Sequence, residues 1–157
     1  MKEEYINPFL VPAKLVWKKE LGVDLELAKA TKVSHQFTTD AITAVIGVSG
    51  ALEGNVLYGF HKDTAKAVVS KMMESEVTEF DEMALSALGE IINMITGNAA
   101  TGLSNAGYPS QISPPVLIEP AGSRFTTMAG PQILVEFTSD LGPLHIRISL
   151  SEKSVRL

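Results

Sequence analysis

Polar and apolar side chains separate onto two sides of a helix when residues 81–98 are placed at about 100° per residue. The apolar side carries Ala84, Leu85, Ala87, Leu88, Ile91, Ile92, Met94 and Ile95, and the polar stripe carries Ser86, Gly89, Glu90, Asn93 and Gly97. Because Glu90 and Asn93 are three residues apart, their side chains are expected to lie together on the exposed side. Gly89 costs about 0.5–1 kcal/mol relative to alanine, which indicates that something approaches the backbone closely there.

The N-terminal segment is also predicted to be helical. Apolar residues recur at helical spacing through residues 9–21, and Gly22 ends the pattern. Asn7 followed by Pro8 is typical of a helix cap and first turn, so the helix is predicted to begin there. Pro12 would remove one main-chain hydrogen bond from that helix, which favours a later start or a bend.

Two more helices are predicted in the middle of the chain. One spans residues 63–73, with Asp63 or Thr64 as its cap. The other is the amphipathic helix described above, which opens after a weak capping box at residues 78–81. It is expected to stop near residues 97–98 and to be followed by a loosely helical tail.

Runs of β-branched or alternating residues, separated by glycine and proline, predict six strands. These are residues 23–36, 41–49, 55–60, 116–119, 132–138 and 144–150. Residues 50–54 and 139–143 are typical of hairpin turns. The order helix, three strands, two helices, three strands favours an α+β fold with two layers, in which helices pack on one face of a largely antiparallel sheet of about six strands.

Composition and charge narrow the class of protein. The chain has 157 residues, 45% of them hydrophobic, so residues 1–157 are expected to form a single domain. A net charge of -5 without a lysine and arginine cluster makes nucleic acid a poor partner. The lack of cysteine excludes disulfides and thiolate chemistry. The start lacks a signal-peptide pattern and no apolar run reaches about 18 residues, so the cytoplasm is the expected compartment and a membrane is not expected.

Glu90 and Asn93 suit a positioning task better than covalent catalysis. No histidine, cysteine or second carboxylate is close to them, so the parts of a nucleophilic triad or of an acid–base carboxylate pair are missing. An asparagine amide is both donor and acceptor and can hold a water molecule in line with an electrophile that a partner supplies. An ionised glutamate can pair with a lysine or arginine of that partner. The simpler alternative is a solvated edge on a core helix.

Other polar residues carry weaker signals. Glu4 and Asn7 have the same separation, but Asn7 precedes Pro8, which disfavours helical geometry, so Asn7 is interpreted as a cap and the pair as non-catalytic. The three histidines are His35, His61 and His145. They lie on separate predicted elements without metal-ligand spacing, and the glycines of residues 47–54 form no dinucleotide fingerprint, so neither a metal site nor a cofactor site is predicted.

Ser86, Glu90 and Asn93 carry a resemblance to a known family. The sequence Ser86-Ala-Leu-Gly-Glu90-Ile-Ile-Asn93 is similar to the signature of the CheC/CheX chemotaxis phosphatases, a serine or aspartate, three residues, glutamate, two residues, asparagine. With one good copy of it, the chain resembles the single-site CheX branch more than the two-site CheC branch. The resemblance extends over nearly the whole chain through Phe80-Asp-Glu, Gly89 to Asn98, Asn7-Pro-Phe9, Ser49-Gly50 with Gly54, and Ser113-Pro-Pro115.

The resemblance implies an activity and a partner. It implies hydrolysis of the aspartyl phosphate of a CheY-like response regulator, with Asn93 orienting the water and Glu90 pairing with the regulator's active-site lysine. Ser86, Gly89 and Gly97 would form the contact stripe around them. The magnesium would belong to the regulator, and the chain would have no cofactor of its own. The resemblance also implies a homodimer made by joining sheets across subunits.

Two other functions stay open on the sequence alone. One is a non-catalytic adaptor of the same fold, which binds a response regulator or a flagellar switch component through the same helix face. The other is a structural sheet-joining protein in which the stripe is an ordinary solvated edge. Binding without an effect on phosphate lifetime would favour the adaptor, and tolerance of alanine at Glu90 and Asn93 in every assay would favour the structural protein.

Overall fold

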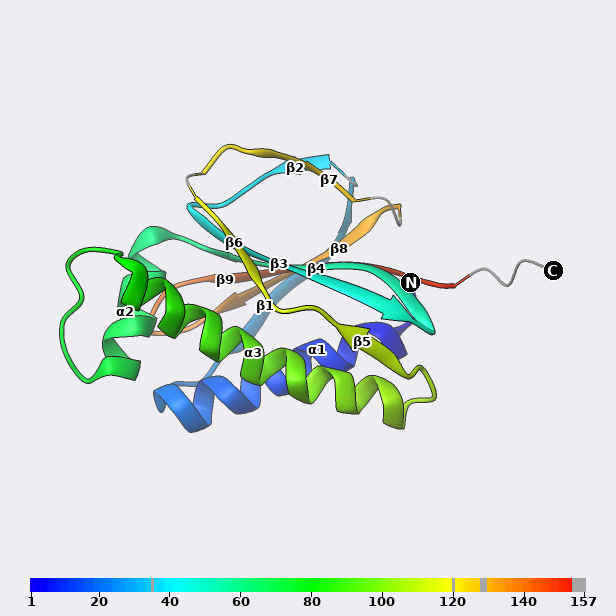
Figure 1. Cartoon of the computed structure of the whole chain (residues 1–157), viewed down its shortest axis with the longest axis horizontal. Coiled ribbons are helices and arrows are strands. Elements are labelled where there is room, and N and C mark those ends of the chain that lie inside the picture. The colour runs from blue at the N-terminus through cyan, green and yellow to red at the C-terminus, as the bar shows by residue number, and fades with distance from the viewer. Residues whose placement is uncertain (35, 120, 128–129, 154–157) are drawn as a thin grey trace.

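Within residues 1–34, 36–119, 121–127 and 130–153, which the computed structural model describes, three α-helices cover one face of a seven-stranded sheet (Figure 1). A two-stranded ribbon stands on the other face. The strand pairs in these residues are antiparallel. The predicted α+β class, with helices packed on a largely antiparallel sheet, is confirmed.

The strands of the described residues are β1 (Glu26–Val33), β2 (Gln36–Thr38), β3 (Ile42–Gly50), β4 (Leu52–Phe60), β5 (Ser110–Ile112), β6 (Val116–Ile118), β7 (Arg124–Thr126), β8 (Gln132–Thr138) and β9 (Leu144–Glu152). The main sheet has the order β1-β8-β9-β4-β3-β5, and β6 also pairs with β3. The predicted hairpins β3–β4 and β8–β9 are confirmed, with Ile42 opposite Phe60 and Phe137 opposite Leu144.

The predicted strand 23–36 contains β1, which pairs with β8, but it is too long. Its last residue, Gln36, belongs to β2, which leaves the sheet and pairs with β7 as the ribbon. His35, between the two strands, lies outside the described residues. The sequence pattern does not predict β5 and β7, because three residues are too few to show an alternation.

The helices are α1 (Glu3–Val16), continued by a π-helical turn η1 (Trp17–Leu21), then α2 (Lys62–Met73) and α3 (Glu82–Asn105). The predicted cap at Asn7 is wrong, because α1 begins at Glu3 and contains both Pro8 and Pro12. Tyr5 and Phe9, one turn apart, are both buried, and only an earlier helix start places both against the core. Gly22, with φ 68°, ends the helical run as predicted.

α3 is longer than predicted. It passes through Gly97 to Asn105, because Ala99 and Leu103 continue its buried side beyond that glycine. Its cap is Asp81, whose side chain accepts a hydrogen bond from the Ala84 backbone N–H at 2.9 Å. Among the helices described, none is long and apolar enough to cross a membrane.

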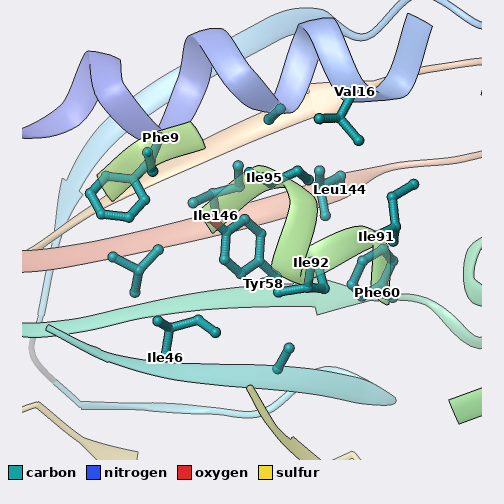
Figure 2. Packing of buried hydrophobic residues seen from close by; sticks show 14 of the residues in the cluster. Phe9, Val16, Ile46, Tyr58, Phe60, Ile91, Ile92, Ile95, Leu144 and Ile146 are labelled. Atoms are coloured by element: carbon teal, nitrogen blue, oxygen red, sulfur yellow. The ribbon is translucent and has the colours of Figure 1, made fainter. Parts of the chain in front are cut away.

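The hydrophobic core lies between the helices and the sheet (Figure 2). It includes Phe9 and Val16 of α1, Ile91, Ile92 and Ile95 of α3, and Ile46, Tyr58, Phe60, Leu144 and Ile146 of β3, β4 and β9. Burial of one such side chain stabilises the fold by about 1.5–3 kcal/mol. Rotating α3 about its axis would expose its three isoleucines, so the core fixes which side of α3 faces solvent.

Candidate functional site

The polar stripe of α3 faces solvent. Ser86, Glu90, Asn93 and Gly97 are exposed, and Gly89 is half-buried. Ile91 and Ile92, between the two polar side chains in sequence, are fully buried. The structure therefore brings the five predicted site residues together on one helix face, as their spacing predicts.

Glu90 and Asn93 are not engaged by the rest of the protein. Neither side chain has a hydrogen-bond or ion-pair partner among the described residues. The Thr96 hydroxyl donates to the backbone carbonyl of Asn93 at 3.3 Å, which leaves the side-chain amide of Asn93 free. A free carboxylate and a free carboxamide together offer acceptors and two N–H donors to a partner.

Gly89 and Gly97 leave open space beside the pair. A Cβ atom added at either glycine would meet no atom within 4 Å, outside its own helix backbone. Tight packing against another part of the described chain is therefore not the reason for glycine at these positions, and Gly97 does not end the helix. A partner's backbone can approach α3 closely on both sides of Glu90 and Asn93.

A groove of about 490 Å³ borders Asn93 on the side of β5. Thr96, Gly97 and Ala100 of α3 form one wall, and the exposed Gln111 is part of the other. The sequence pattern does not predict this wall, because its residues lie between two turn-forming prolines, Pro109 and Pro114. The run Ser-Gln-Ile between these prolines is the only local signal for a strand.

Hydrogen bonds fix the β5 wall to the central strands. The Leu52 backbone N–H donates to the Ser110 hydroxyl at 3.2 Å, and the Gly47 backbone N–H donates to the Ser113 hydroxyl at 2.8 Å. The Ser113 backbone N–H in turn donates to the Gly47 carbonyl at 2.9 Å. The groove beside Asn93 therefore has a rigid wall, which suits recognition of a defined partner surface.

Glu4 and Asn7 are also exposed and on one helix, α1. Pro8 lies inside α1, so the prediction that it keeps Asn7 out of a helix is wrong. The carboxylate of Glu4, however, accepts a hydrogen bond from the Tyr108 hydroxyl at 3.0 Å, and the Tyr108 ring packs edge-on against Tyr5 with centroids 5.0 Å apart. This glutamate already serves the packing of α1 against the segment that follows α3.

Polar side chains also gather on the sheet face opposite the helices. His145 Nδ1 lies 3.5 Å from the Asp40 carboxylate, and its Nε2 lies 3.8 Å from the Glu136 carboxylate. The contact between His145 and Asp40 raises the pKa of the histidine and lowers the pKa of the aspartate. The ring of His61 is 5.9 Å away, edge-on. Sequence spacing does not bring these groups together, because they come from separate elements.

No group of three or more His, Asp or Glu side chains in the described ranges could hold a metal ion. His145 instead lies within ion-pair distance of both Asp40 and Glu136. The arrangement on α3 offers hydrogen-bond donors and acceptors and one negative charge, which suit the orienting of a reactant supplied by a partner.

Comparisons with known proteins agree with the fold. The family model for the chemotaxis phosphatase CheX matches residues 42–152, which include α3 and six of the main-sheet strands. The CheY-P phosphatase CheX of Thermotoga maritima is 39% identical over 99 residues. That alignment covers 62% of this chain and 64% of the relative, so the match spans less than two thirds of the relative's length.

Solved structures are similar over nearly the whole chain. Chemotaxis protein CheX from Vibrio vulnificus is 25% identical with a TM-score of 0.82, covering 94% of this chain and 99% of that one. A chain of the CheX-CheY-BeF3-Mg²⁺ complex from Borrelia burgdorferi is 27% identical with a TM-score of 0.75, covering 94% of this chain and 98% of that one. Because the family model matches more than half of its residues, the chain belongs to the CheX family of chemotaxis phosphatases.

Proposed function

We propose that the protein hydrolyses the aspartyl phosphate of a CheY-like response regulator, with Asn93 catalytic and Glu90 binding the regulator beside it. The observation that carries the proposal is that both side chains are exposed and unpartnered on the α3 face where the family signature falls. The Thermotoga relative is a CheY-P phosphatase, and the Borrelia complex contains CheX with CheY, which supports a partner of this class.

Asn93 positions the attacking water. Its amide holds the water in line with the phosphorus atom of the regulator's phosphoaspartate. The water oxygen bonds to phosphorus as the bond from phosphorus to the aspartyl oxygen breaks, which yields inorganic phosphate and a free aspartate carboxylate. Such positioning contributes a factor of about 10² in rate, or about 2.7 kcal/mol, which is sufficient because an acyl phosphate is already reactive.

Glu90 fixes the position of the regulator on α3. Its carboxylate pairs with the regulator's active-site lysine one helical turn from Asn93. A hydrogen bond between charged groups contributes about 1.5–3 kcal/mol when it is shielded from water by the partner. The contact stripe of Ser86, Gly89 and Gly97 allows the regulator backbone to approach α3, since the two glycines present no side chain there.

The magnesium ion belongs to the regulator in this proposal. Magnesium sites use carboxylates together with phosphate oxygens, and a phosphorylated receiver supplies both. The residues that the structure describes offer no group of three or more metal-ligating side chains. In this proposal the chain contributes Glu90 and Asn93 to the joint site, and the regulator supplies the magnesium.

A homodimer joined through its sheets is also proposed. β1 pairs with β8 on one side, and none of the described strands pairs with its other side. An unpaired edge of eight residues is a ready template for a strand of a second copy. Sedimentation that shows a dimer, and loss of that dimer when Ala28 or Ala30 of β1 is replaced by proline, would support this arrangement. A monomer at all concentrations would contradict it.

The activity is tested by the decay of phosphate from CheY-like regulators in magnesium, with and without the protein. Acceleration by the wild type is expected, and Asn93→Ala should remove about 99% of it because the water is no longer oriented. Retained binding of Asn93→Ala to the regulator carrying beryllofluoride separates catalysis from recognition. Unchanged decay for every regulator of the source organism would overturn the enzyme proposal. Persistent binding in that case would favour the adaptor.

A further inference from the structure

A second groove, of about 500 Å³, lies between α1 and α3. Pro8, Val11 and Leu15 line it from α1, and Asn98, Thr101 and Gly102 line it from α3. Asn98 is about 140° round the helix from Asn93, whereas Thr96 and Ala100 turn toward β5. The two grooves therefore flank the polar stripe of α3 on opposite sides.

The wall formed by α1 is apolar and exposed. Val11 and Leu15, one helical turn apart, are 55% and 65% exposed and together form an apolar surface on α1. On the opposite wall, the Asn98 side chain donates to the Met94 carbonyl at 2.9 Å and the Thr101 hydroxyl donates to the Gly97 carbonyl at 3.4 Å. With these polar groups satisfied by their own helix, the groove favours an apolar occupant.

The groove is continuous with the face that carries Asn93. Asn98 follows Asn93 by five residues, a rise of about 7.5 Å along the helix axis. Gly97 lies between them, is exposed, and has no side chain to form a barrier. At the far end, Gly102 allows close packing, since a Cβ there would lie 3.2 Å from the Cβ of Pro8. A partner seated over Asn93 can thus extend an apolar group into the groove.

Positive charges lie beside the Leu15 end of the groove, where Lys14 and Lys18 are exposed on α1 and η1. At the other end the Glu4 carboxylate, which lines the groove, accepts a hydrogen bond from the Tyr108 hydroxyl. The pair between Lys18 and Asp24, at 3.3 Å, is largely exposed, so it neutralises little of the positive charge toward a partner. A regulator presents negative charge around its phosphoaspartate, because carboxylates hold its magnesium ion.

We propose that the groove between α1 and α3 receives an apolar side chain of the same response regulator, close to its phosphorylation site, and that Val11 and Leu15 set the affinity for the regulator. The choice of partner rests on the proposed phosphatase function. The groove side of α1 binds the body of the regulator, while Glu90 and Asn93 engage its active site. Hot spots of this kind combine an apolar anchor with charged groups around it.

The test uses Leu15→Asn, Val11→Asn and the double variant, which alter exposed side chains. Met73→Asn, at an aliphatic position of α2 that is 37% exposed, is the matched control. Kd for the regulator carrying beryllofluoride is measured in the Asn93→Ala background, and KM and kcat in the wild-type background. The double variant should raise Kd and KM about tenfold and keep kcat within twofold, while Met73→Asn should change none of them.

Each outcome decides between the two proposals. An unchanged Kd for the double variant would overturn the groove proposal, and the effect of Asn93→Ala on phosphate decay would still judge the phosphatase. A weaker Kd with no phosphatase activity in the wild type would support the groove and overturn catalysis. A rise in Kd for Met73→Asn as large as that for the double variant would show that the effect is not specific to the groove. A changed sedimentation of the free protein, with Kd unchanged, would assign the groove to a second copy and overturn the proposal.

Discussion

Glu4 and Asn7 on α1 have the same separation as Glu90 and Asn93 on α3, and all four residues are exposed. The difference lies in their partners. The Glu4 carboxylate accepts a hydrogen bond from Tyr108 at 3.0 Å, whereas the Glu90 side chain has no partner in the described part of the chain. Spacing on a helix therefore locates a candidate pair, and the engagement of its side chains distinguishes a structural pair from one available to a ligand.

The space around the two pairs also differs. Next to Asn7, Pro8 packs against Gly102 of α3, where an added Cβ would come within 3.2 Å. Next to Asn93, the space at Gly89 and Gly97 is open to at least 4 Å. The α1 pair belongs to a contact between two helices, and the α3 pair belongs to a free surface.

The largest expected difference between the pairs is in catalysis. Asn93→Asp replaces an amide donor by a negative charge that would face the phosphoryl group, so kcat/KM should fall more than about 100-fold. The matched Asn7→Asp variant should keep kcat within twofold of the wild type, and KM is compared separately because Asn7 lines the groove between α1 and α3. Phosphate release from one regulator is measured for both variants. A loss of rate for Asn7→Asp as large as that for Asn93→Asp would contradict the distinction between the two pairs.

The glutamates should separate activity from stability. Glu90→Gln removes the negative charge that pairs with the regulator's lysine, so kcat/KM should fall about tenfold while the free energy of unfolding stays the same. Glu4→Gln should leave kcat unchanged and lower the free energy of unfolding by about 1 kcal/mol or less. Steady-state kinetics and urea unfolding of both variants check this, and a stability loss confined to Glu90→Gln would contradict it.

Tyr108→Phe tests the partner of the α1 pair. The substitution keeps the ring contact with Tyr5 and removes the hydroxyl, so the free energy of unfolding should fall by about 0.5–1 kcal/mol with no change in phosphatase rate. Combined with Glu4→Gln, it should cost little more than Tyr108→Phe alone, because the glutamine can only weaken a hydrogen bond that Tyr108→Phe removes. Full additivity in urea unfolding would show that the bond does not stabilise the protein.

The contact between His145 and Asp40, on the sheet face opposite the helices, is expected to have the smallest effect on stability, and this effect should depend on pH. A raised His145 pKa stabilises the fold below the ordinary value of 6.5, and this contribution is lost as pH rises through the folded-state pKa. A lowered Asp40 pKa stabilises above 3.8, and that contribution is lost as pH falls. The contact should therefore contribute most between about pH 4 and 6.5, by about 1 kcal/mol or less.

His145→Gln should reduce the loss of unfolding free energy that accompanies a rise in pH above about 6.5 or a fall below about 4, as followed by urea unfolding at several pH values. Tyr108→Phe should keep that dependence, because the Tyr108 hydroxyl bonds to Glu4 and not to His145 or Asp40. An unchanged pH profile in His145→Gln would show that the contact with Asp40 does not form in solution.

The sequence predicts the elements with long, regular patterns. Residues 132–138 alternate and form β8, and the buried side of α3 repeats over several turns. The errors occur where tertiary contacts outweigh local preference. α1 begins before the good cap residue Asn7, because the earlier start buries Tyr5. α3 continues beyond Gly97, because the longer helix buries Leu103.

The candidate site could be predicted in part. Glu90 and Asn93 lie on one helix, so their shared face follows from periodicity. Gln111, Val11 and Leu15 come from other elements, and only the packing of α1 and β5 beside α3 brings them to the same surface. The Glu4 interaction with Tyr108 joins residues 104 positions apart, which no local pattern records.

The most direct test of the central claim is phosphate release from a phosphorylated regulator at saturating concentrations of the wild type, Asn93→Ala and Asn7→Ala. Saturation removes differences in binding, so the rates report the orientation of water alone. If Asn93 orients the attacking water, the phosphate release rate with Asn7→Ala should equal that with the wild type, and the rate with Asn93→Ala should be about 100-fold slower. Equal rates for Asn93→Ala and the wild type, or an equal loss in both variants, would contradict it.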